Sequence, residues 1–383
     1  MRAISDYTQA LQIDPKNAYA FYNRGISHDR AGMYADAIKD FTSAIDLLPH
    51  NADFFHNRGF CFRKQGEFQK AIGDYTHALR IDPRHFKAVY NRAFSYDKLS
   101  RYADAVADYT AAISLDPRNS NAFHNRGSTL DKIGRTEEAI ADFTRAIELD
   151  PRSACSYNSR GLSRDRSGNR DKAIADFTEA IALEPDNPVY RHNRGFCHRN
   201  RGDFVKAIED YSLAVESDPS NAAAHSNRGY AWRKLGEFDR AVDDYTKALE
   251  LDPDNVKTFN NRGYSYAKSG KYDMAIQDYS AVIRLDPGNS HAYHNRGISY
   301  DKKGQFEEAI RDFTRVLELD SSNANAYFNR GSTHDSIGAY DKAIADYTRA
   351  LELDRQVSGS PSTTGGGTVA SDAGADGLGR THG

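Results

Sequence analysis

One tripeptide, Asn-Arg-Gly, returns along this chain on a fixed 34-residue grid, and this spacing restricts the fold more than any other feature. The grid has two small variations, because Ala93 ends the tripeptide at the third point and Ser159 begins it at the fifth. No insertion breaks the register. A chain of 383 residues would otherwise suggest two or three globular domains, whereas this period predicts stacked copies of one small element.

Each 34-residue repeat is predicted to form two amphipathic helices, because apolar or small residues recur at steps of three and four with charged residues between them. In the first repeat, Gly32 separates the helices, since glycine tolerates the left-handed conformation that commonly closes a helix. Gly25 and Ala37 are small enough to let the paired helices approach closely, and Phe41 fills the space between repeats. One helix pair cannot bury its apolar face alone, so we expect an all-α solenoid of ten stacked pairs.

These patterns resemble the tetratricopeptide repeat: aromatic–Gly–aromatic in the first helix, Ala–aromatic–Ala in the second, and a closing Asp-Pro. The resemblance covers a half repeat at residues 1–17, containing the second helix only, and ten helix-turn-helix repeats at residues 18–357. It implies a right-handed superhelix whose first helices line a concave groove. Residues 358–383 form a low-complexity tail rich in Gly, Ser and Thr, which we expect to be disordered.

No polar helix caps the repeats at either end, which leaves two alternatives open. The chain is a fragment of a longer array or enzyme, or it self-associates through its uncapped ends.

The charge balance argues against nucleic-acid binding, because 51 basic and 54 acidic residues give a net charge of −3. The sequence shows no secretion signal and no run of 18 apolar residues, so we expect no membrane contact. Its three cysteines, Cys61, Cys155 and Cys197, are too scattered for a disulfide framework or a zinc cluster. They indicate a cytoplasmic protein, with a ciliary or other intracellular assembly left open. Cys61 and Cys197 share a column of small residues and are predicted to be packing residues.

The asparagine column is the leading candidate for function. It is similar to the asparagine ladder in the groove of the O-GlcNAc transferase array, and that resemblance implies peptide binding. A carboxamide offers both a donor and an acceptor, so it can pair with the backbone of any extended peptide. The alternative is that each asparagine bridges neighbouring backbone within the solenoid. The ladder residues are Asn23, Asn57, Asn91, Asn125, Asn193, Asn227, Asn261, Asn295 and Asn329.

The column that precedes the ladder is predicted to line the groove with polar and aromatic side chains. Two of its histidines, two repeats apart, would be separated by roughly 16–20 Å, which is too far to share a metal ion. We therefore predict no metal site. The groove-lining candidates are Tyr22, His56, Tyr90, His124, His192, His294 and Phe328.

An arginine column runs unbroken from Arg24 to Arg330, where the tetratricopeptide family usually shows an apolar residue. An equally unbroken aspartate column runs along the second helices from Asp40 to Asp346. We therefore expect each arginine to pair with the aspartate of its own repeat, which would set the helix register.

A second set of basic residues lies on the predicted groove rim, where most are offset by a neighbouring aspartate. The offset fails at three places, and these are the candidate anion contacts, with an ordinary solvated face as the alternative. They are Arg63, Lys64, Arg199, Arg201, Arg233 and Lys234.

Catalytic and cofactor-binding motifs are absent, and the repeats occupy nearly all of the sequence predicted to be ordered. We therefore expect a non-enzymatic scaffold, without cofactors, that binds extended segments of other proteins in a concave groove. Two alternatives stay open: a substrate-targeting array of a larger, glycosyltransferase-like enzyme, and a structural component of a transport or ciliary assembly.

Overall fold

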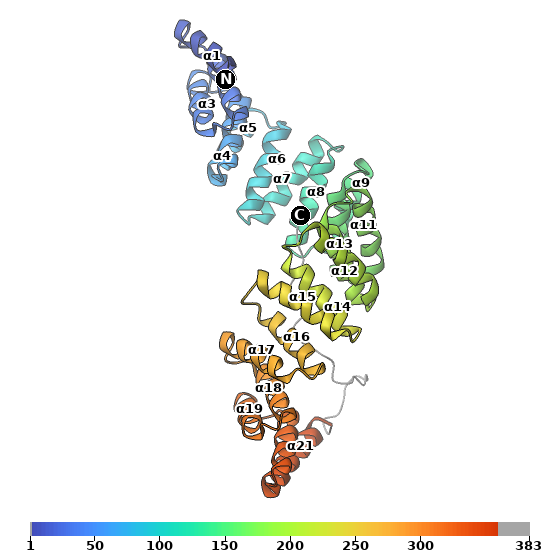
Figure 1. The fold of residues 1–383 in the computed structure, drawn as a ribbon. Coiled ribbons are helices and arrows are strands. Elements are labelled where there is room, and N and C mark those ends of the chain that lie inside the picture. The colour runs from blue at the N-terminus through green and yellow to red at the C-terminus, as the bar shows by residue number, and fades with distance from the viewer. Residues whose placement is uncertain (1, 359–383) are drawn as a thin grey trace. The chain divides into compact units, whose positions relative to one another are not determined.

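The computed structural model describes residues 2–358, and within this range the chain forms 21 α-helices and no strand. It divides into two compact halves between Pro185 and Asp186, and each half is described by itself. Figure 1 shows the helices coloured along the chain. The all-helical repeat architecture expected from the 34-residue grid is confirmed. The superhelical handedness and the repeat boundaries at residues 17 and 357 stay predictions, and the predicted tail lies outside the described residues from position 359 onward.

The amino-terminal half contains a lone helix, α1 (Arg2–Ile13), followed by five helix pairs. The first helices of the pairs are α2 (Ala18–Arg30), α4 (Ala52–Lys64), α6 (Phe86–Lys98), α8 (Ser120–Lys132) and α10 (Ala154–Arg166). Their second helices are α3 (Tyr34–Leu47), α5 (Phe68–Ile81), α7 (Tyr102–Leu115), α9 (Thr136–Leu149) and α11 (Arg170–Leu183).

The carboxy-terminal half contains five further pairs. Its first helices are α12 (Pro188–Arg201), α14 (Ala222–Lys234), α16 (Val256–Lys268), α18 (Ser290–Lys302) and α20 (Ala324–Ser336). Its second helices are α13 (Phe204–Ser217), α15 (Phe238–Leu251), α17 (Tyr272–Leu285), α19 (Phe306–Leu319) and α21 (Tyr340–Ser358).

Most first helices begin after an asparagine that caps them. The Asn17 side chain accepts a hydrogen bond of 2.9 Å from the backbone N–H of Ala20, which satisfies a donor that the first turn of α2 cannot pair internally. At α6 the imidazole of His85 takes this role and accepts from Ala88 at 3.1 Å. The recurring asparagine therefore marks in the sequence where most first helices begin.

The paired helices approach closely where glycine faces an aromatic ring, as predicted. A Cβ atom added to Gly25 would lie 2.8 Å from Cε1 of Phe41, which is too short for a carbon contact. Ala37, Phe41 and Ala44 of α3 are almost fully buried, so this contact lies in the core. In the third repeat Ala93 occupies the glycine position and packs with Tyr109, so that repeat accommodates one extra methyl group.

The turn inside each pair requires a left-handed residue. Gly32 adopts a φ of 75°, as predicted. Glycine occupies the equivalent position in all the remaining repeats except the third. There, Ser100 adopts a φ of 59°, which costs free energy because its Cβ crowds the backbone. Its hydroxyl accepts a hydrogen bond of 3.3 Å from Tyr102, which offsets part of this cost.

Ser100→Gly is predicted to raise the free energy of unfolding by about 1 kcal/mol, because glycine adopts the left-handed conformation without strain. The readout is the midpoint of urea unfolding followed by circular dichroism. Gly66→Ser, at the equivalent turn of the second repeat, is the matched control and should lower the midpoint. A lower midpoint for Ser100→Gly would contradict this account and would mean that the Tyr102 hydrogen bond outweighs the backbone strain.

Candidate functional site

Nine arginines of the column that begins at Arg24 each connect three helices from two repeats. Arg58 on α4 donates from Nε and Nη2 to the carboxylate of Asp74 on α5, at 2.9 and 2.7 Å. Its Nη1 donates to the hydroxyl of Thr42 on α3 of the preceding repeat, at 3.1 Å. The predicted arginine–aspartate pairing is confirmed, whereas the link to the hydroxyl was not anticipated. Its sequence signal is a Thr or Ser two residues after the aspartate, as in Asp40 and Thr42.

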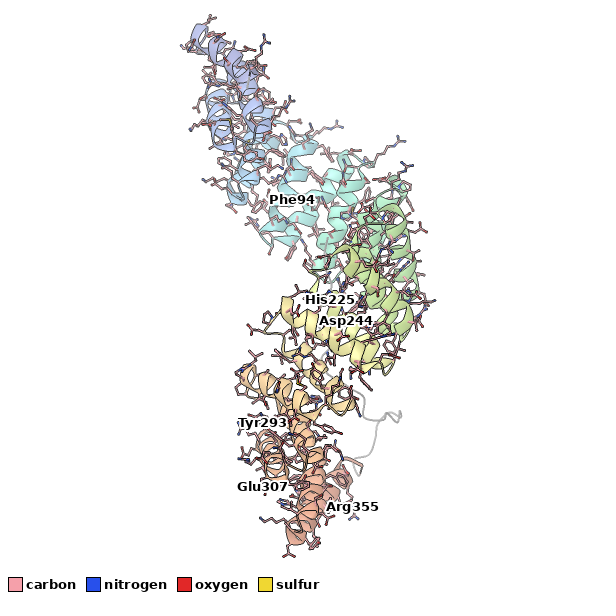
Figure 2. All side chains as sticks on the ribbon, in the orientation of Figure 1. Phe94, His225, Asp244, Tyr293, Glu307 and Arg355 are labelled. Carbon is pink, nitrogen blue, oxygen red and sulfur yellow. The ribbon has the colours of Figure 1, made fainter. Side chains whose placement is uncertain are left out.

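We call each such group an arginine node, consisting of one arginine, the aspartate of its own repeat and the hydroxyl of the repeat before. Asp244, labelled in Figure 2 beside His225, accepts from Arg228 at 2.7 Å, and His225 Nδ1 lies 3.4 Å away. Complete nodes are formed by Arg24–Asp40–Thr8, Arg58–Asp74–Thr42, Arg92–Asp108–Thr76, Arg126–Asp142–Thr110, Arg160–Asp176–Thr144, Arg228–Asp244–Ser212, Arg262–Asp278–Thr246, Arg296–Asp312–Ser280 and Arg330–Asp346–Thr314.

The asparagine ladder bridges the first helices of consecutive repeats. Asn57 Nδ2 on α4 donates to the hydroxyl of Tyr22 on α2 and to the Asp53 carbonyl, each at 2.9 Å. Asn125 likewise donates to the Tyr90 hydroxyl at 2.5 Å. For Asn57 and Asn125, the expectation that both the amide N–H and the carboxamide oxygen are available to a peptide is therefore wrong, because the array itself uses the amide N–H. Asn57 bonds both to a side chain of the preceding repeat and to a backbone carbonyl of its own helix.

Histidine replaces tyrosine as the acceptor in three other bridges. Nδ2 of Asn91 lies 3.2 Å from His56 Nε2, Asn227 lies 3.1 Å from His192 and Asn329 lies 3.1 Å from His294. In all three histidines burial is the main cause that lowers the pKa from 6.5 to about 4. Each ring is therefore neutral at pH 7 and its Nε2 can accept the amide hydrogen.

Most carboxamide oxygens of the ladder, unlike the amide nitrogens just described, have no hydrogen-bond partner among the described residues. Within the described residues, seven of them receive no donor, and their side chains are only partly buried: Asn23, Asn57, Asn91, Asn125, Asn261, Asn295 and Asn329. Asn227 differs, because its Oδ1 accepts from Arg199 at 2.9 Å. Asn193 and Asn227 are also buried, so the expectation that all nine asparagines are exposed to a ligand is wrong for these two.

The predicted groove-lining residues fall into a buried group and an exposed group. His56 and His192 are buried against Tyr75 and Tyr211, so their assignment as groove contacts is wrong, because their rings belong to the core. Tyr22, Tyr90, His124 and His294 are partly exposed. Phe328 is 57% exposed and lines a pocket on α20 and α21 with Tyr347 and Leu351.

Three of the candidate anion contacts are arginines held between aromatic rings of consecutive first helices. The Arg63 guanidinium lies 4.7 Å from the centroid of Phe60 on α4 and 4.9 Å from that of Phe94 on α6, which Figure 2 labels. The same sandwich holds Arg199, with Phe196 at 4.4 Å and Tyr230 at 5.1 Å, and Arg233, with Tyr230 at 5.0 Å and Tyr264 at 4.8 Å. The flat faces of these guanidinium groups are thus occupied by protein.

The remaining candidates divide into two kinds. Lys64 and Lys234 are exposed, with their ammonium groups 5.5 Å from the rings of Phe60 and Tyr230. Arg201 instead donates from Nε to the carboxylate of Asp203 at 2.8 Å, so its expected lack of a local aspartate is wrong.

The aspartates of the rim column act between repeats. Asp97 accepts from Lys132 at 2.6 Å and from the Thr129 hydroxyl at 2.9 Å, both on the next first helix. Asp97 therefore pairs with a lysine of the next repeat and not with its neighbour Lys98, because adjacent residues on a helix point in different directions. These ion pairs are a further set of links between repeats.

Within residues 2–358, no group of three or more His, Cys, Asp or Glu side chains could hold a metal ion. None of the helices in that range is long and apolar enough to cross a membrane. Cys61 and Cys197 are buried, which confirms their predicted packing role, and Cys155 is exposed.

Family models for the tetratricopeptide repeat match nearly all of the helical region. The matched residues are 18–51, 52–85, 86–119, 120–153, 158–222, 222–255, 256–289 and 294–361. No curated protein gives a significant match to the chain.

Several solved structures are similar to parts of this chain. A tetratricopeptide repeat protein from Parabacteroides merdae is 17% identical, with a TM-score of 0.49, covering 65% of this chain and 98% of that one. A MamA protein is 27% identical, with a TM-score of 0.43 and coverages of 45% and 94%. YrrB, described as having an unusual peptide-binding site, is 22% identical, with a TM-score of 0.45 and coverages of 48% and 95%. The resemblance to the ladder of O-GlcNAc transferase stays a prediction.

Asp142→Asn is predicted to lower the free energy of unfolding by about 3 kcal/mol, because it leaves the charge of Arg126 without its buried carboxylate. Asp104→Asn is the matched control, since it breaks an exposed pair with Arg101 that contributes about 1 kcal/mol or less. The readout is urea unfolding of both variants. Equal effects of the two substitutions would contradict the structural role of the node.

His294→Tyr is predicted to leave stability at pH 7.5 unchanged and to reduce its loss in acid. Tyr keeps an acceptor for Asn329, as Tyr22 does for Asn57, but does not titrate in this range. The folded pKa of His294 is lowered to about 4, so below pH 6.5 only the unfolded state takes up its proton. Between these values the histidine costs about 1.4 kcal/mol of stability per pH unit as the pH falls. Urea midpoints between pH 7.5 and 4.5 measure the difference, and parallel curves for both proteins would contradict it.

Proposed function

Because the repeat models cover most of this chain and it therefore belongs to the tetratricopeptide repeat family, we propose that it is a protein-binding scaffold without catalytic activity. Its first helices bind an extended segment of a partner protein. The carboxamide oxygens of the asparagine ladder accept backbone N–H groups of that segment. The partly exposed aromatic side chains of the preceding column contact its side chains.

The proposal rests on the different partners of the nitrogen and the oxygen in the ladder carboxamides that bridge two repeats. The amide nitrogens of Asn57, Asn91 and Asn125 bond to the preceding repeat, whereas their oxygens receive no donor from the described residues. A fixed nitrogen restricts the rotation of the side chain, so the oxygen is held in one orientation before a partner binds. An acceptor of this kind suits a backbone N–H, which every peptide residue except proline offers.

The spacing of the first helices favours an extended ligand. Within each half, first helices of consecutive repeats contact each other, for example α4 with α6 and α16 with α18, while consecutive second helices do not. The ladder residues of consecutive repeats therefore follow one another along one side of each half. An elongated strip of acceptors fits an extended chain better than a compact ligand.

The proposal is tested with peptides selected against the full chain from a random phage-displayed pool. Replacing Asn57, Asn91 and Asn125 with alanine removes three oxygens and is predicted to weaken a selected peptide by at least about tenfold, at roughly 1 kcal/mol per hydrogen bond. Methylating the backbone nitrogens of the peptide at contact positions should weaken binding to the unchanged protein in the same way.

Tyr22→Phe with Tyr90→Phe is the matched control. It keeps both rings and the asparagine oxygens but breaks two of the bridges that orient them, so binding is predicted to weaken by less than in the alanine variant, which loses the oxygens themselves. Binding that persists in this control and is lost in the alanine variant supports the ladder. Binding that the alanine variant retains would show that the asparagines serve only the array.

A further inference from the structure

Among the described residues, the longest uninterrupted run of ladder oxygens without a donor lies in the amino-terminal half. Ser159 ends this run in the fifth repeat. In the carboxy-terminal half Asn193 is buried and Oδ1 of Asn227 accepts from Arg199 at 2.9 Å, so fewer consecutive oxygens remain there. We call the run in the amino-terminal half the four-asparagine run, and its members on α2, α4, α6 and α8 are Asn23, Asn57, Asn91 and Asn125.

The oxygen of Asn57 is oriented by the hydrogen bonds of its own amide group. Nδ2 donates to the backbone carbonyl of Asp53 at 2.9 Å, and because a carbonyl can only accept, this bond assigns the nitrogen side of the carboxamide. The Tyr22 hydroxyl receives the second donor at 2.9 Å. Asn91 and Asn125 make the corresponding bridge to the repeat before each of them. Three neighbouring oxygens are therefore held in place as acceptors, one in each repeat.

The spacing of the first helices sets the distance between these acceptors. Cα atoms of α2 and α4, of α4 and α6, and of α6 and α8 come within 8 Å of each other. Phe60 and Phe94 each stand three residues after a ladder asparagine. The Arg63 guanidinium lies 4.7 Å from one ring centroid and 4.9 Å from the other, so the two centroids are at most about 10 Å apart, in agreement with the 8–10 Å typical of packed helices.

A polyproline II helix matches this spacing. It rises about 3.1 Å per residue with three residues per turn, so the N–H groups of every third residue point the same way at intervals of about 9.3 Å. It makes no internal hydrogen bonds, so these N–H groups are free to donate. In a β-strand, N–H groups on one side recur at every second residue, about 6.6 Å apart, and the next multiple is about 13 Å. One acceptor per repeat therefore favours the polyproline II conformation over a β-strand.

The side chains beside the four-asparagine run suit a proline-rich segment. The position three residues after each ladder asparagine lies on the same side of the first helix. In the first three repeats it holds Ile26, Phe60 and Phe94, all of which are partly exposed. Proline-rich segments dock on aromatic surfaces at a low entropic cost, because proline fixes the conformation before binding. Proline has no N–H, so it fits the two residues of each turn that face no asparagine.

We propose that the four-asparagine run binds a polyproline II segment of a partner protein, in which every third residue keeps its N–H and the two residues between are open to proline. Three turns separate the four asparagines, so the segment is about ten residues long. This proposal names the class of segment that the scaffold binds and rests on the proposed scaffold function.

Fluorescence anisotropy with labelled 15-residue peptides and the full chain tests this inference. The first peptide repeats Leu-Pro-Pro and offers an N–H at every third residue. The second has the same composition, but its leucines occupy alternate positions of the first nine residues, so at most two N–H groups fall on the three-residue period. The third is the first peptide with N-methylated leucines. The first peptide is predicted to bind at least about tenfold more tightly than either of the others, because they lose two or more backbone hydrogen bonds.

Ser159→Asn is predicted to extend the run by one carboxamide and to tighten binding of the first peptide by about fivefold. His124 stands 35 residues before this position, as His56 stands before Asn91, so the new side chain has the same kind of partner. The substitution is a gain of affinity, which a general loss of structure does not produce.

Asn91→Ala is predicted to weaken binding of the first peptide by about fivefold. Asn329→Ala is the matched control, because it breaks the same kind of bridge to a histidine but lies outside the four-asparagine run. Its effect should stay within about twofold. Circular dichroism verifies that each variant folds.

Equal binding of the first and second peptides, or of the first and its N-methylated form, would overturn the proposal. Equal effects of Asn91→Ala and Asn329→Ala would overturn it too, as would unchanged affinity in Ser159→Asn. If the peptides selected in the ladder experiment bind through the asparagines while the Leu-Pro-Pro peptide fails, the scaffold function stands and only this inference is lost.

Discussion

The pairing of a partly buried guanidinium with a buried carboxylate in each arginine node is the interaction on which the rest of this structure depends. A charged group taken out of water is costly unless its donors are paired, and here two donors meet a carboxylate and a third meets a hydroxyl of the preceding repeat. The three acceptors fix the position of one side chain relative to three helices. A slip of either helix would leave a buried charge unpaired. The node therefore specifies the register of the helices, while the Gly–aromatic contacts supply the close packing.

The node also fixes the backbone position of the proposed binding residue, because the ladder asparagine directly precedes the node arginine in the sequence. Arg58 is held by Asp74 on α5 and Thr42 on α3, and Asn57 lies one residue earlier on α4, where its amide reaches the Tyr22 hydroxyl. Structural and binding roles thus divide between adjacent residues. Variation between repeats then occurs in the rim column, where Asp97 links two first helices by an ion pair and Arg233 links them by ring contacts.

The fold could be predicted almost completely from the sequence, because its constraints are local and repeated ten times. The left-handed turn at Gly32 and the pairing of Arg24 with Asp40 both follow from residue type and spacing. The site was harder to predict, since the hydrogen bond of Asn57 depends on Tyr22, 35 residues away in a neighbouring repeat. Burial of His192 and the sandwich around Arg233 likewise depend on side-chain directions that a helical period does not define.

A double-mutant cycle between Thr110 and Arg126 tests the central claim most directly, because this pair crosses from one repeat to the next at 3.0 Å. The free energies of unfolding of Thr110→Val, Arg126→Met and the double variant give the coupling between the two side chains. A coupling of about 1.5 kcal/mol is predicted, which is typical of a hydrogen bond to a charged group. Additivity within about 0.3 kcal/mol would contradict it and would mean that ring and methyl packing alone holds consecutive repeats together.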